Sequence, residues 1–145
     1  MAVKTFTSIV QFQAYVEEKI QKALMAAAVR ITRELRNFIK SQYYNDPEFY
    51  PNIYKRTYQF LDSASYRLIG KNLAEIGIDT DLMHYFNNFD PDQVVEWAAQ
   101  SMHGAPLYQT STTDFWTAFL NWADDNVMDI LKEELKNQGL NIIQK

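Results

Sequence analysis

The sequence contains no cysteine, and glycine and proline occur only four times each among its 145 residues. The lack of cysteine excludes a thiol nucleophile, an iron–sulfur cluster and a cysteine-based zinc site. All four glycines are isolated, so there is no glycine-rich phosphate loop. The longest apolar run, residues 23–29, is too short to span a membrane, and the N-terminus lacks the apolar core of a signal peptide. We therefore expect a protein that is made, and stays, on the cytoplasmic side of any membrane.

Positive charge is also in short supply. The formal net charge is −4 and the sequence pI is about 5.1, which argues against a sequence-independent grip on DNA but leaves room for one local basic stripe. Hydrophobic residues make up 47% of the chain and aromatic residues 14%, a composition typical of a folded globular protein. The length is that of one domain, so we predict a single domain over residues 1–145.

A long helix is predicted from Ser8 to about Gln42, a stretch without glycine or proline. Ser8 and Gln11 have the spacing of a capping box, and the run from Asn45 to Pro47 marks the end. At 1.5 Å per residue this helix would be about 50 Å long, which is more than the core of so small a domain requires. The apolar residues recur every three or four positions, at Ile9, Phe12, Val16, Ile20, Leu24, Ala27, Ile31, Leu35 and Phe38.

The remaining elements predict an α+β fold, in which a long N-terminal and a C-terminal helix pack on a small antiparallel sheet. Alternating apolar residues over 63–79, with a turn at 70–72, predict a β-hairpin. Asp90 and Pro91 open a short helix over residues 91–102, which ends at Gly104. A polar loop over 105–113 follows. The last helix runs from near Asp114 to Gly139, and residues 140–143 are expected to add a short closing strand.

Candidate chemistry is weak throughout. Asp79, Asp81 and His84 are close in sequence, but an Asp-Thr-Asp run is more typical of a turn than of a metal site. His103 is expected at a helix end, where a partly positive imidazole suits the helix dipole. Adjacent acidic pairs such as residues 124–125 diverge by about 100° on a helix and do not converge on one site. We therefore predict no catalytic residue, no cofactor and no metal.

Two surface features leave alternatives open. Arg30, Arg33, Arg36 and Lys40 share one side of the long helix, as a solvated face or as a contact with an acidic neighbour or with DNA. The three tryptophans, at 97, 116 and 122, fit either core packing or a binding surface. Trp116 and Trp122 point in different directions on a helix, so at least one is expected on the rim.

An aromatic segment, residues 43–60, follows the long helix and holds seven aromatic side chains among two prolines, which predicts an ordered but irregular loop. At its end, residues 54–63 resemble the motif Tyr-x-Arg-Thr-x-x-Leu-x-x-Ser of tail-completion, or head–tail joining, proteins of siphophages, through Tyr54, Arg56, Thr57 and Ser63, with Phe60 at the leucine position. These are often described as minor capsid or minor structural proteins. The long helix before the motif, the hairpin after it and the C-terminal helix over 115–135 are similar too, so the resemblance covers most of the chain.

The resemblance implies a structural subunit of the virion, which forms a ring, commonly six-fold, between the head connector and the tail tube. Its partners would be other neck and tail proteins and its own copies, with passive contact to DNA in the ring lumen; it would occupy the host cytoplasm and then the virion. No membrane and no small-molecule substrate is implied. The candidate assembly interface combines the aromatic segment with the arginine stripe: Tyr50, Tyr54, Arg56, Thr57, Tyr58, Phe60, Arg30, Arg33 and Arg36.

The chain departs from the family pattern at two places. Tyr58 stands where many members have glycine, and the predicted helix end at residues 102–104 stands where many have a strand followed by Gly-Thr. Arg56 and Thr57 also admit a purely local role, with a stacked guanidinium and a hydroxyl that caps the loop backbone. The alternative function is a small intracellular protein- or peptide-binding module, whose aromatic loop and hairpin enclose a peptide or hydrophobic ligand.

Overall fold

The computed structural model describes residues 3–49, 59–84, 90–103, 108–141 and 143. Its elements confirm the predicted α+β class, with two long helices and a small antiparallel hairpin. In chain order they are α1 (Ile9–Phe38), a π-helix η1 (Ile39–Tyr44), α2 (Gln59–Asp62), β1 (Ala64–Ile69), β2 (Leu73–Ile78), a 3₁₀ turn η2 (Thr80–Leu82), α3 (Pro91–Ala98), β3 (Met102–His103), β4 (Tyr108–Gln109) and α4 (Phe115–Asn137).

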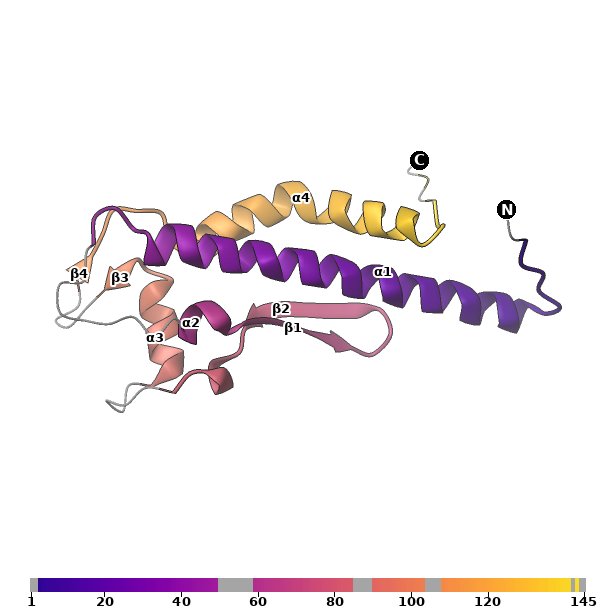
Figure 1. The fold of residues 1–145 in the computed structure, drawn as a ribbon, viewed down its shortest axis with the longest axis horizontal. Coiled ribbons are helices and arrows are strands. Elements are labelled where there is room, and N and C mark those ends of the chain that lie inside the picture. Colours follow the sequence, from indigo (N-terminus) through magenta and orange to yellow (C-terminus); the bar gives the residue numbers. More distant parts are fainter. Residues whose placement is uncertain (1–2, 50–58, 85–89, 104–107, 142, 144–145) are drawn as a thin grey trace.

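Helix α1 forms the middle layer of the molecule. It runs along the long axis, with α4 on one side and the β1–β2 hairpin on the other (Figure 1). At 30 residues it is about 45 Å long. Its predicted start is confirmed: the Ser8 side chain accepts a hydrogen bond from the Gln11 backbone N–H at 3.2 Å. In a capping box the Gln11 side chain would accept a hydrogen bond from the Ser8 backbone N–H. Here it accepts one from the backbone N–H of Thr7, the residue before.

The predicted hairpin is confirmed. Tyr66 pairs with Ile76 and Leu68 with Ala74, so the alternating apolar residues of both strands share one face. Gly70 in the connecting turn has φ of 62°, a conformation that glycine adopts without strain. Helix α4 also begins and ends where the sequence predicts: Asp114 caps its first turn, and Gly139, with φ of 84°, closes a Schellman motif at its last turn.

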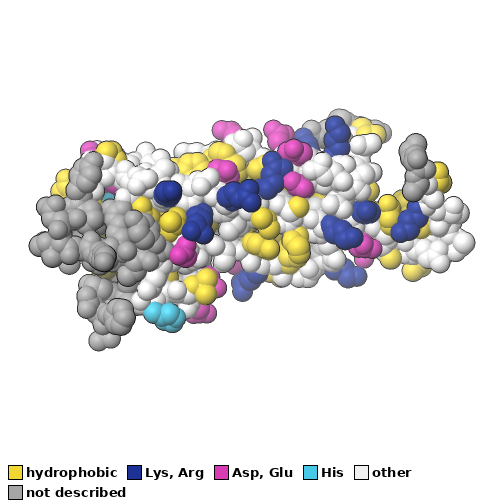
Figure 2. Space-filling model, in the orientation of Figure 1, with side chains coloured by type: hydrophobic (Ala, Val, Ile, Leu, Met, Phe, Trp, Pro, Cys, Tyr) yellow, Lys and Arg dark blue, Asp and Glu magenta, His cyan; other side chains and the backbone are white. Residues whose placement is uncertain are grey.

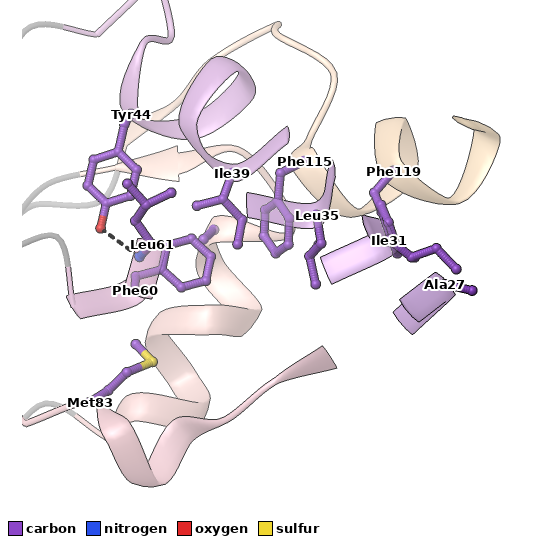
Figure 3. Close-up of a cluster of buried hydrophobic side chains, with 11 residues drawn as sticks. Ala27, Ile31, Leu35, Ile39, Tyr44, Phe60, Leu61, Met83, Phe115 and Phe119 are labelled. Atoms are coloured by element: carbon purple, nitrogen blue, oxygen red, sulfur yellow. Dashed lines mark hydrogen bonds between the residues drawn. The ribbon is translucent and has the colours of Figure 1, made fainter. Parts of the chain in front are cut away.

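The core lies at the end of the molecule where α1 becomes the π-helix. Leu35 and Ile39 meet Phe60, Phe115 and Phe119 there, and Tyr44 accepts a hydrogen bond from the Leu61 backbone N–H at 3.3 Å (Figure 3). The wide turn of η1 is marked by the Asn45 N–H, which bonds the Lys40 carbonyl five residues back. It aims the side chain of Tyr44 into the core.

Three sequence predictions about the later elements are wrong. The short helix ends at Ala98 instead of running to Met102, because Ser101 adopts a left-handed conformation with φ of 55° that no helix can continue. Residues 102–103 and 108–109 form a small strand pair within the predicted helix end and polar loop. No closing strand follows α4 in the described residues: Leu140 and Ile143 belong to no strand, and Ile142 lies outside the description.

No helix in the described ranges is both long enough and apolar enough to cross a membrane.

Candidate assembly interface

The arginine stripe of α1 is largely occupied by contacts within the chain. The Arg30 guanidinium donates to Glu133 at 3.0 Å and to Glu134 at 2.8 Å, which joins α1 to α4. The hydrogen bonds that Arg30 donates to Glu134 and Glu133 raise its pKa. Arg36 donates to Asp62 at 2.7 Å and joins α1 to α2. Arg30 and Arg36 therefore belong neither to a purely solvated face nor to a surface that is free to contact a partner.

Arg33 and Lys40 are the exposed remainder of the stripe. No ion pair to either is formed by the part of the chain that the structure describes. Arg33 also borders a shallow hollow of about 310 Å³ between α1 and α4, which Trp122 and Asn126 line from the other side. Figure 2 shows this charge arrangement, with Lys and Arg along the band over α1 and Asp and Glu over α4. The stripe thus offers a partner one arginine and one lysine instead of four cations.

The aromatic segment is described only in part. Tyr50, Tyr54, Arg56, Thr57 and Tyr58 lie outside the described residues, so their role in an interface stays a prediction.

Phe60, the remaining candidate of that segment, belongs to the core. It is 2% exposed, and its ring centroid lies 5.4 Å from that of Tyr43 and 5.2 Å from that of Phe115. A side chain so covered has no surface to give to a partner. The prediction that Phe60 lies at an assembly interface is therefore wrong, because α2 turns this aromatic side chain inward, onto the end of α1 and the start of α4.

The tryptophans occupy an intermediate position. Trp116 and Trp122 lie on either side of Phe119 on α4, with ring centroids 5.7 and 6.0 Å from its ring. Both are half-buried, and so is Trp97 on α3. Part of each α4 indole therefore faces outward, as the sequence predicts for at least one of them, while the rest covers the core.

A buried polar cluster that the sequence did not indicate lies just beyond η1. Asp46 is 2% exposed, and its carboxylate accepts hydrogen bonds from the hydroxyls of Thr110 and Thr112 and from the backbone N–H of Glu48. His103 Nε2 lies 3.0 Å from the same carboxylate. The cluster ties the end of η1 to β3 and to the segment that leads into α4.

Stacked rings enclose the histidine of this cluster. Tyr43 lies parallel to the His103 ring at a centroid distance of 4.5 Å, and Phe49 covers its other face at the same distance. His103 is 3% exposed. The prediction of His103 at a helix end is wrong, since α3 has already stopped and this residue belongs to β3. Its position depends on the carboxylate and the two rings instead of a helix dipole.

The arrangement favours a stabilising role over catalysis. In a nucleophilic triad the imidazole stands between hydroxyl and carboxylate, so that it can take the hydroxyl proton. Here the carboxylate of Asp46 stands in the centre, and the hydroxyl of Thr110 and the imidazole of His103 both point to it. Burial raises the pKa of Asp46, but the hydrogen bonds from Thr110, Thr112, Glu48 and His103 outweigh burial and hold that pKa below its usual value.

The predicted turn near His84 is confirmed. The Asp79 side chain accepts from the Asp81 backbone N–H at 3.1 Å and so caps η2. The His84 backbone N–H donates to the Gln59 side chain at 2.6 Å, a bond that fixes the chain after η2 against α2. In the described ranges no three acidic or histidine side chains gather in a way that could hold a metal ion.

A strongly exposed apolar surface lies at the opposite end of the molecule. The first turns of α1 extend beyond both α4 and the hairpin turn (Figure 1). Ile9 is 73% exposed, Val10 69% and Phe12 49%. We call Ile9–Phe12 the α1 tip. Next to it an open groove of about 380 Å³ is lined by Val16, Ile20, Leu24, Asn72, Leu131, Leu135, Leu140 and Asn141, and we call this the α1–α4 groove.

The described residues thus define an α+β protein with a closed polar cluster at one end and an exposed apolar helix end at the other. A family model described as YomN matches residues 8–142, nearly the whole chain, and the chain belongs to the YomN family. No curated protein and no solved structure matches the chain significantly.

Proposed function

We propose that this protein is a virion structural subunit of a long-tailed phage or prophage, of the head–tail joining or tail-completion type. Membership of the YomN family suggests a phage-related protein. The finer role is supported by the motif around Tyr54, Arg56 and Thr57 and by the order of long helix, hairpin and C-terminal helix. In this proposal the chain supplies shape and contact surface, and performs no chemistry of its own.

The main observation in support of the proposal is that α1 is longer than α4 and the hairpin, the two elements that cover it. A helix that served only its own domain would be expected to end where α4 and the hairpin end, because further apolar turns gain nothing from exposure to water. The α1 tip instead holds Ile9, Val10 and Phe12 in the open. Exposed apolar surface of this kind is typical of subunits that associate with other proteins.

In the assembled neck, copies of the chain would form a ring between the connector and the tail tube. A ring needs contacts between two different surfaces of each subunit. We assign Arg33, Lys40 and the aromatic residues Tyr50, Tyr54 and Tyr58 to these contacts, with Arg56 and Thr57 beside them. The protein would be made in the host cytoplasm and then become part of the virion, where the ring lumen would contact DNA passively.

The test is a stop codon early in the gene, followed by phage induction and electron microscopy of the lysate. We expect DNA-filled heads and separate, complete tails, and infectious particles should return when the intact gene is supplied from a plasmid. Normal virions in the absence of the protein would rule the proposal out.

A point substitution separates the role of the motif from folding. Arg56→Gln, supplied in place of the intact gene, should give the same unjoined heads and tails while the purified variant keeps the unfolding midpoint of the parent protein. Arg67→Gln is the matched control, since Arg67 is an exposed arginine of the hairpin and its pair with Glu75, on the neighbouring strand, is local. It should support normal virions.

A further inference from the structure

We propose that two copies of this chain pair by laying the α1 tip of each into the α1–α4 groove of the other, with the two α1 helices antiparallel. The pairing uses the same exposed tip that supports the proposed function, but it is tested separately, by the oligomeric state of the purified chain.

The first argument is that the tip and the groove are uncovered parts of one apolar stripe. Ile9, Phe12, Val16, Ile20 and Leu24 follow each other at intervals of three or four residues, so they fall on one side of α1. Further along the helix the same side is buried, with Ala27 at 2% and Ile31 at 5% exposure. The stripe loses its cover where α4 and the hairpin turn end, and a second apolar surface would restore that cover.

The second argument is that charged side chains are absent from both surfaces. No charged residue occurs from Thr5 to Val16, although charged residues make up 22% of the chain. The residues that line the groove are also uncharged: six aliphatic side chains and two asparagines. Packing Ile9–Phe12 against the groove lining therefore buries no charged side chain of either set, whereas a charged partner would incur a desolvation cost of several kcal/mol per ion. Lys4 and Lys19 lie beside this surface, over the ring of Tyr15. Gln11 and Gln13 of the tip are suited to hydrogen bonding with Asn72 and Asn141 at the groove margin.

The spacing of the stripe favours an antiparallel pair. With the two helices crossing at Val16, Phe12 of one copy faces Ile20 of the other, and Ile9 faces Leu24. Each exposed tip then meets a groove that α4 and the hairpin turn already wall. A parallel pair would set groove against groove, with two copies of α4 and of the hairpin turn crowded around them. Glu17, near the crossing point, is already paired with Lys71 at 3.2 Å, which offsets its charge.

Because each copy gives and receives the same contact, the pair is isologous and closes on itself. Its driving force is apolar burial, so the pair should resist salt, unlike a contact through Arg33 and Lys40.

Sedimentation analysis of the full chain at rising concentration tests the pairing. We expect a species of twice the 17.0 kDa chain mass at high salt as well as low. Ile9→Glu should leave only the monomer. An acidic residue suits the first turn of a helix, so this variant should fold as the parent does. Met25→Glu is the control: Met25 is 44% exposed on the same helix, about 180° around from Val16, and its variant should still pair.

Cysteine cross-linking tests the direction, since the parent chain has no cysteine. Under mild oxidation Val16→Cys should give a disulfide-linked dimer. Ile9→Cys mixed with Leu24→Cys should give a mixed dimer, while Ile9→Cys alone should not. A chain that stays monomeric at every concentration would overturn the proposal, and so would self-linking of Ile9→Cys. If the chain were monomeric and Ile9→Glu nevertheless blocked virion assembly, the apolar stripe would be a contact surface for another neck protein.

Discussion

The two ends of α1 show how one helix can serve two purposes. At its C-terminal end Leu35 and Ile39 are fully covered, and the chain beyond closes around the carboxylate of Asp46. At its N-terminal end Ile9 and Phe12 continue the same apolar side, but nothing within the described chain covers them more than partly. The closed end supplies the free energy that holds the fold together. The open end is held in place by that stability, and we propose that it contributes surface for contact with another chain.

The largest expected difference between the two ends comes from the same truncation at each. Phe60→Ala should lower the free energy of unfolding by about 4 kcal/mol, since it leaves a cavity beside Tyr43 and Phe115. Phe12→Ala should cost less than about 1 kcal/mol, because its ring is half exposed already. Urea unfolding followed by tryptophan fluorescence measures both. Similar losses at the two positions would contradict the division into a closed and an open end.

The next effect comes from the polar cluster. Asp46→Ala should cost about 3 kcal/mol, because it removes the carboxylate that the buried His103 and Thr110 and the half-buried Thr112 share. Asp124→Ala, an exposed aspartate of α4, should change the free energy of unfolding by less than about 0.5 kcal/mol. Chemical denaturation at neutral pH measures both losses, and equal losses for the two variants would contradict the stabilising role of the cluster.

Acid should reveal the same cluster without truncation. Because the pKa of Asp46 lies below the usual 3.8 in the folded protein, the unfolded chain takes up the proton first as the pH falls. The stability that Asp46 contributes is thus complete above the unfolded pKa and disappears as the pH falls through the lower folded value. Between about pH 5 and pH 2 we expect the advantage of the parent protein over Asp46→Asn to shrink as the pH falls. A constant difference across this range would contradict the shift.

The smallest effect is expected from the arginines along the middle of α1. Arg36→Gln should cost about 0.5 kcal/mol at low salt, since its pair with Asp62 is exposed, and nothing in concentrated salt. Arg33→Gln is the matched control and should have no effect on unfolding at either ionic strength. Thermal unfolding at two salt concentrations tests the pair. A loss for Arg33→Gln equal to that for Arg36→Gln would show that Arg33 too is paired within the chain.

Elements governed by local signals were predictable from the sequence. The Ser8 cap, the alternation in the hairpin and the Asp114 and Gly139 ends of α4 depend on residues a few positions apart, and the structure confirms each. The short helix was overextended because one serine, Ser101, takes a left-handed conformation that carries no sequence signal. The π-helix was missed for a similar reason: its apolar spacing differs from that of an α-helix by a single residue.

Features that join distant parts of the chain were not predictable. Asp46 looks like an ordinary turn residue before Pro47, while its partners His103, Thr110 and Thr112 lie 57, 64 and 66 residues further along. Arg30 reads as a surface cation until α4 brings Glu134 beside it, 104 residues away. Periodicity assigns a residue to a side of a helix, but only the packing of the other elements decides what faces that side.

The central place of α1 has a consequence for the order in which the protein can fold during synthesis. Helix α1 leaves the ribosome before both elements that flank it, and of these two the β1–β2 hairpin precedes α4. At usual elongation rates the 99 residues from the end of α1 at Phe38 to the end of α4 at Asn137 take about 5–20 s to make. During that interval the nascent chain can already hold the hairpin against α1, but the side of α1 that α4 will cover is exposed to solvent. We expect chaperones that bind exposed apolar surface to bind this side of α1 until α4 covers it.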